Sequence, residues 1–162
     1  MSKVRRSYAP LTLNDLKQLK ELALEEHEQF FKRNPHLEKA YHNSLIAICL
    51  CQGAASHYIN PMIGVKDFDI WHFYVESESI PFPYRAWKRV ENGYKGKPID
   101  FLKRAIPRRI YESHIDKPDQ VLLEYLLARD TLTKKLLLKK AIIDLFPDGI
   151  FGKILWKGEL NL

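Results

Sequence analysis

Cysteine, glycine and long apolar runs are scarce in this sequence. Its 162 residues include two cysteines and seven glycines, and no internal repeat is evident, which excludes collagen-like and repeat architectures. The longest apolar run covers residues 45–51, far short of the ~20 residues that a membrane-spanning helix needs. No apolar signal core follows the basic N-terminus. The sequence therefore predicts a cytoplasmic protein with no membrane partner.

The two cysteines, Cys49 and Cys51, lie within that apolar run. There is no second cysteine pair to complete a zinc site, and the C-x-C spacing is not the redox spacing. We therefore expect both to be small buried residues in a reducing compartment.

Positive charge is concentrated in one stretch. The net charge of the chain is +6, yet residues 84–109 hold nine basic residues against two acidic ones, a local charge of +7. The basic residues are Arg85, Lys88, Arg89, Lys95, Lys97, Lys103, Arg104, Arg108 and Arg109. This 84–109 segment either binds RNA or another polyanion, or is an ordinary solvated face.

Periodicity predicts an α+β fold in a single domain covering residues 1–162. An N-terminal helix is expected within 12–33, with Thr12 as its cap, Asp15 in capping-box position and an acidic outer face. Strands are expected at 44–51, 67–76 and 98–105 within a core spanning 36–115. A helical extension, 116–162, follows. In it, Pro118 starts one helix and Thr131 caps a second that continues to Phe146, giving a C-terminal helical hairpin.

The most informative pattern combines a glycine turn with paired carboxylates. Gly53 and Ala54 follow the first strand, and Asp67 and Asp69 stand two apart where the second strand starts, so that their carboxylates project from one face. Such a pair repels unless a cation lies between its members, and Mg²⁺ is a suitable hard cation. A glycine turn entering a helix offers backbone N–H groups to phosphate. Together these features predict a site for a metal–nucleoside triphosphate complex.

This arrangement resembles the signature of the polymerase-beta-type nucleotidyltransferase superfamily. Its phrases CQGAA, GVKDFDIW and YxGxxID are similar to those of a little-studied prokaryotic group of predicted nucleotidyltransferases, and the resemblance covers roughly residues 44–105. It implies a small mixed β-sheet flanked by helices. It also implies a third carboxylate on a neighbouring strand, and Asp100 stands where that residue is expected. By this resemblance Asp67, Asp69 and Asp100 would be both catalytic and metal ligands.

The sequence departs from the superfamily pattern after Gly53. Members that transfer nucleotides usually have serine there to contact the triphosphate, whereas this chain has Ala54. The predicted phosphate-binding residues are Gly53, Ala54, Ser56 and Lys66, although Lys66 is more readily interpreted as a solvent-exposed charge than as a phosphate ligand. Losing one hydrogen bond to a charged phosphate would cost about 1.5–3 kcal/mol.

Three functions follow from these features. The first is metal-dependent transfer of a nucleoside monophosphate from a nucleoside triphosphate to an acceptor hydroxyl, with Mg²⁺ as cofactor and pyrophosphate released. The second is a catalytically weak or inactive nucleotide- or RNA-binding module on the same fold. The third is an interaction protein whose acidic N-terminal helix shields a basic face.

Aromatic residues and histidines are expected to be structural. Trp71, Phe73, Tyr74 and Trp87 are interpreted as core residues more readily than as base-stacking ones. The six histidines show no ligand spacing such as H-x-x-x-H, and we expect His57, His72 and His114 to be surface or half-buried residues.

Overall fold

The computed structural model describes residues 6–84 and 86–158. Its helices are α1 (Leu13–Arg33), α2 (Pro35–Tyr41), α3 (Gln52–Ile59), α4 (Arg108–Ser113), α5 (Pro118–Leu127) and α6 (Leu132–Lys139). Its strands are β1 (Leu45–Cys51), β2 (Phe68–Val75), β3 (Ala86–Tyr94), β4 (Lys97–Ile106), β5 (Ile142–Phe146) and β6 (Ile154–Trp156). Two short 3₁₀ turns, Pro61–Ile63 and Asp148–Ile150, complete the elements.

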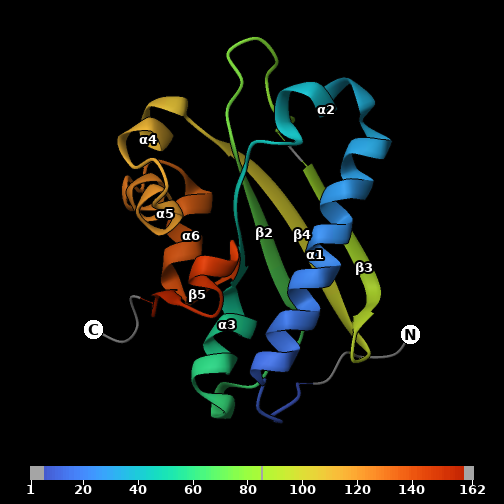
Figure 1. Cartoon of the computed structure of the whole chain (residues 1–162). Helices are drawn as coiled ribbons and strands as arrows, with labels where there is room; N and C mark the ends of the chain where they lie inside the picture. The colour runs from blue at the N-terminus through green and yellow to red at the C-terminus, as the bar shows by residue number, and fades with distance from the viewer. Residues whose placement is uncertain (1–5, 85, 159–162) are drawn as a thin grey trace.

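The strands form one mixed sheet in the order β3-β4-β2-β1-β5-β6. β2 and β4 pair in parallel, and every other neighbouring pair is antiparallel. The chain is therefore an α+β protein with a six-stranded mixed sheet flanked by helices (Figure 1).

Apolar side chains cover the sheet on both faces. On one face Leu16 and Leu19 of α1 pack with Ala55 of α3 over β1, β2 and β4. On the other face Leu122 of α5 and Leu138 of α6 pack against the same central strands. The alternation of side chains along each strand explains why β1 and β2, buried on both faces, are almost continuously apolar.

Helix α1 begins as the sequence predicts. Thr12 is its N-cap, and the Thr12 and Asp15 side chains form the reciprocal capping box. The Asp15 carboxylate also accepts hydrogen bonds from Tyr94 Oη (2.5 Å) and Lys95 Nζ (2.8 Å). The N-terminal end of α1 is thereby fastened to the turn between β3 and β4.

Two parts of the predicted secondary structure are wrong. The segment 86–94 is strand β3, for which no strand is predicted, because the pair Asn92–Gly93 within it is typical of a turn or helix stop. The second C-terminal helix ends at Lys139 rather than Phe146, because Ile142–Phe146 pairs with β1 as β5. The described part of this segment, residues 116–158, is therefore a helical hairpin followed by two strands, not a purely helical extension.

In the part of the chain that the structure describes, no helix combines the length and hydropathy needed to span a bilayer. Cys49 and Cys51 are buried and unbridged, in agreement with the prediction of two small core residues.

Candidate functional site

The structure brings Asp69 and Asp100 together on adjacent strands. Asp69 of β2 and Asp100 of β4 are register partners in the parallel pair, so their side chains leave the sheet on the same face. Asp67 stands directly before β2 and lies close enough for its charge to act on Asp69. The three predicted carboxylates therefore lie at one end of the β2–β4 ladder.

The Asp69 carboxyl is in a strongly unfavourable environment for a negative charge. Burial, then the charges of Asp67 and Asp100, and then a hydrogen bond with Asp100, raise the pKa of Asp69 to about 7. Arg89 lowers this pKa only partly. The raised pKa therefore follows first from burial of the carboxyl and then from like charges crowded together with too little positive charge beside them.

Asp100 is held by two side chains of β3. Arg89 Nη1 donates to Asp100 Oδ2 at 2.8 Å, and Trp87 Nε1 donates to Asp100 Oδ1 at 3.1 Å. Arg89 is the register partner of Asp100, and its Nε also donates to Glu91 at 3.0 Å. Both carboxylate oxygens of Asp100 therefore accept a hydrogen bond from β3. Among the described residues, no basic side chain makes a hydrogen bond to Asp69.

Asp69, Asp100 and the two side chains that hold Asp100 line a pocket of about 300 Å³. Its walls are Gln52, Asp69, Trp71, Trp87, Arg89, Asp100 and Leu102. Gln52 occupies the junction between β1 and α3 with φ of +61°, a left-handed conformation that is unusual for a residue other than glycine. Gln52 Nε2 donates to the backbone oxygen of Leu136 at 3.3 Å, which ties this junction to α6.

The four predicted phosphate-binding residues have different surroundings. A Cβ at Gly53 would meet no atom within 4 Å, so the backbone is open to a close approach. Ala54 packs its side chain in the core. Ser56 is also buried, and its Oγ accepts from Ala141 N at 3.3 Å. Ser56 lies in the wall of a different pocket, together with Lys139 and Lys140, and not in that of the carboxylate pocket.

Lys66 is exposed and does not belong to the wall of the carboxylate pocket. This position agrees with the interpretation of Lys66 as a solvent-exposed charge.

The basic residues of the 84–109 segment do not form one surface. Strand alternation puts Arg89 and Arg104 on the face of Asp100, whereas Lys88 and Lys103 project towards α1. Lys103 is 1% exposed and pairs with Glu26 of α1. These two lysines therefore lie on the opposite face of the sheet from the carboxylates, so the segment does not offer a single basic surface beside them, and Arg85 lies outside the described residues.

The aromatic residues divide in the same way. Trp71, Phe73 and Tyr74 are buried, as predicted. Trp87 is 59% exposed, so its interpretation as a core residue is wrong. Beside Trp87, Tyr84 is 77% exposed, and its ring lies 5.3 Å from the Arg104 guanidinium.

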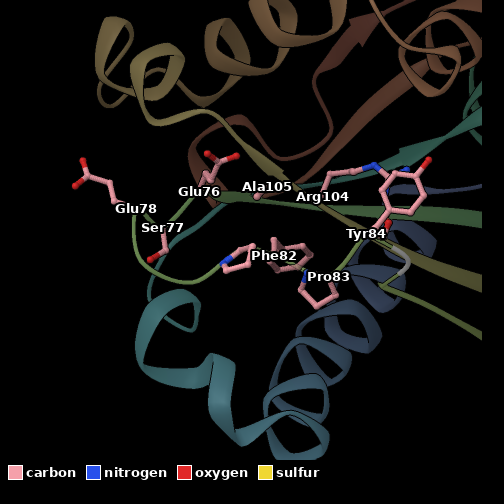
Figure 2. A pocket seen from close by; sticks show the side chains of 9 residues that line it. Glu76, Ser77, Glu78, Phe82, Pro83, Tyr84, Arg104 and Ala105 are labelled. Atoms are coloured by element: carbon pink, nitrogen blue, oxygen red, sulfur yellow. The ribbon is translucent and has the colours of Figure 1, made fainter.

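Figure 2 shows a further pocket, about 400 Å³, whose lining includes Tyr84 and Arg104. It is formed by residues 76–84 together with the end of β4. Glu76 and Glu78 project at its rim, so it is less suited to a polyanion than the pocket beside Asp100.

Two of the histidines are more deeply buried than predicted. His57 and His72 are both 0% exposed, and each binds a backbone oxygen, that of Ala9 and Ala23 respectively. Burial lowers the pKa of His72 to about 3, so its imidazole is neutral. His114 is half-buried, as predicted, and pairs with Glu124.

The three carboxylates suit Mg²⁺ by their chemistry. They are hard oxygen donors, and the raised pKa of Asp69 marks a place where a cation would relieve repulsion.

Comparisons with protein-family models, with curated proteins and with solved structures found no match for this chain.

Proposed function

We propose that the protein is a metal-dependent nucleotidyltransferase with a small nucleotidyltransferase-like fold. The observation that carries the proposal is the register pairing of Asp69 with Asp100, with Asp67 beside Asp69 and the open backbone of Gly53 at the adjacent start of α3. Paired carboxylates next to a helix N-terminus are suited to a metal–triphosphate complex.

Each residue has a distinct part in this proposal. Asp67 and Asp69 would hold Mg²⁺, which when bound neutralises the charge of the triphosphate. The backbone N–H groups at Gly53 and Ala54 would contact the phosphates. Asp100 would orient the acceptor hydroxyl and accept its proton as the oxygen attacks the α-phosphorus and pyrophosphate leaves. The acceptor is a small molecule, a protein hydroxyl or an RNA end.

The test is release of labelled pyrophosphate by the wild type and by Asp69→Asn, with each nucleoside triphosphate and a pool of acceptors. Asparagine keeps the shape but removes an anionic ligand, so we expect release to fall by at least about 100-fold. The matched control is Asp116→Asn, an exposed left-handed position far along the chain that asparagine tolerates. Equal release by wild type and Asp69→Asn would reject the proposal.

A second function, nucleotide binding without turnover, is favoured by one observation. Asp100 already has Arg89 and Trp87 on its two oxygens, so it is less available to a metal or to a hydroxyl proton. If Mg–nucleotide raises the melting temperature of the wild type and not of Asp69→Asn, while neither protein releases pyrophosphate, the binding module is correct and the enzyme is not.

A further inference from the structure

A second group of metal-ligand side chains lies where α1 meets the end of α2. Among the described residues, His27, Glu28 and His42 are the one set of three or more His, Cys, Asp or Glu side chains whose ligand atoms all lie within 4.8 Å of one another. His27 and Glu28 are neighbours on α1, and His42 is the C-cap residue of α2. The turn between the two helices brings residues 15 positions apart into one cluster.

The hydrogen bonds of the cluster fix which atoms face one another. Nδ1 of His42 bonds to Asn43 Oδ1 at 3.1 Å, and Nε2 of His42 lies 2.6 Å and 2.8 Å from the two carboxylate oxygens of Glu28. Nδ1 of His27 bonds to the hydroxyl of Tyr74 at 2.8 Å. The His27 ring also makes a hydrogen bond to the backbone of His42, which a metal bound at Nε2 would replace. Each histidine thus has an oxygen partner on Nδ1.

This pattern is typical of histidine ligands of metals. A metal-bound imidazole usually donates its other ring N–H to an oxygen, which fixes both the ring orientation and the tautomer. Asn43 and Tyr74 supply these oxygens here. An ordinary ion pair explains His42 and Glu28, but it requires neither the third donor nor the support of both rings.

Burial gives the cluster a closed side and an open side. His27 is 7% exposed and stacks on the Tyr74 ring, with Phe31 at its edge. The side chains of His42 and Glu28 are 31% and 50% exposed. An ion could therefore enter from solvent, meet three protein ligands and keep one coordination position for water.

We propose that His27, Glu28 and His42 form a zinc-binding site. Two imidazole nitrogens and one carboxylate oxygen suit Zn²⁺, whereas Mg²⁺ prefers oxygen ligands alone. The site is separate from Asp69: Tyr74 lies five residues further along β2, about 17 Å at the usual rise of a strand, and α2 is at the opposite end of the molecule from α3 (Figure 1). Bound zinc would fasten α1 to the end of α2.

The test is titration of the metal-free full chain with ZnCl₂, followed by calorimetry and by melting temperature, with MgCl₂ in parallel. We expect one Zn²⁺ to bind per chain and to raise the melting temperature, and Mg²⁺ to have no such effect at this site. His42→Gln and Glu28→Gln should each bind Zn²⁺ at least about tenfold more weakly. Both residues are partly exposed, so these variants should fold.

The matched control is His114→Gln. It removes a surface His–Glu pair, 2.9 Å between His114 and Glu124, that is not part of the His27 cluster. It should bind Zn²⁺ like the wild type. The proposal is overturned if the wild type binds no Zn²⁺, if His42→Gln binds it equally well, or if His114→Gln loses as much affinity as His42→Gln.

Discussion

At the scale of single residues, Asp144 is a carboxyl buried in the sheet at a cost in stability. It is 0% exposed on β5, opposite Cys49, and neither of its carboxylate oxygens has a hydrogen-bond partner among the described residues. Burial, and then the charge of Asp119, raise the pKa of Asp144 to about 9, with Lys153 opposing. The carboxyl is therefore protonated and neutral in the folded protein at pH 7.

We predict that Asp144→Asn raises the free energy of unfolding at pH 7 by up to about 4 kcal/mol, less the cost of burying the amide. The unfolded carboxyl loses its proton near pH 4 and the folded one near pH 9, so folding takes up a proton between these values. Wild-type stability should therefore fall as pH rises from about 4 to 9, and the variant should lack this contribution. Urea unfolding at pH 5, 7 and 9 measures both curves; parallel curves would contradict the pKa of Asp144.

At the scale of elements, a buried ion pair joins α1 to the sheet. Lys103 Nζ of β4 lies 2.7 Å from Glu26 Oε2, and Arg33 Nη2 lies 2.6 Å from the same oxygen. The Lys103 ammonium also lies 4.7 Å from the centre of the Phe30 ring. The acidic helix therefore neutralises basic residues of its own chain, at Lys103 here and at Lys95 through Asp15.

We predict that Glu26→Gln destabilises the protein by about 3–5 kcal/mol, because it leaves the Lys103 ammonium buried without a counter-charge. The double variant Glu26→Leu/Lys103→Met should be far less destabilised, since neither charge then needs a partner. Urea unfolding free energies test this. Glu124→Gln is the control: it alters a more exposed pair with His114 and should leave stability nearly unchanged. A double variant no more stable than Glu26→Gln would show that the pair itself stabilises the fold.

Local signals were sufficient to predict the elements they begin. The Thr12 capping box, the Pro118 start and the Thr131 cap each depend on a few adjacent residues, and all three are confirmed. Strand β3 was missed because Asn92–Gly93 is typical of a turn. Gly93 is needed there for its small size, because a Cβ at this position would lie 2.5 Å from Ile99 Cγ1 on the neighbouring strand.

At the scale of the whole molecule, the features that could not be predicted from the sequence are those that depend on contacts between distant segments. The apolar run at Ile142–Phe146 fits a helix or a strand equally well, and its place beside β1 decides between them. The meeting of Asp69 and Asp100 was predictable from strand alternation and from the resemblance. The contacts of Trp87 and Arg89 with Asp100 were not, because they require β3 beside β4. His27 and His42 meet only through the turn between two helices.

The central position of β1 predicts how the chain tolerates truncation. A chain ending at residue 140 lacks β5 and leaves one edge of the apolar strand β1 unpaired, so we expect it to aggregate. A chain ending at residue 152 keeps β5 and loses the edge strand β6 with the residues that flank it, so we expect it to fold with reduced stability. Size-exclusion chromatography and circular dichroism distinguish the two; a monomeric, folded 1–140 chain would contradict this prediction.

The same strand order affects how the chain folds during its synthesis on the ribosome. Synthesis delivers β1, β2, β3 and β4 first, but the free edge of β1 can pair only after Phe146 has left the exit tunnel. Until then the nascent chain carries an open strand of sequence Leu-Ile-Ala-Ile-Cys-Leu-Cys. Partly made chains with such edges are prone to associate. The interval between the emergence of β1 and the emergence of β5 from the tunnel is therefore the one in which a chaperone has most to protect.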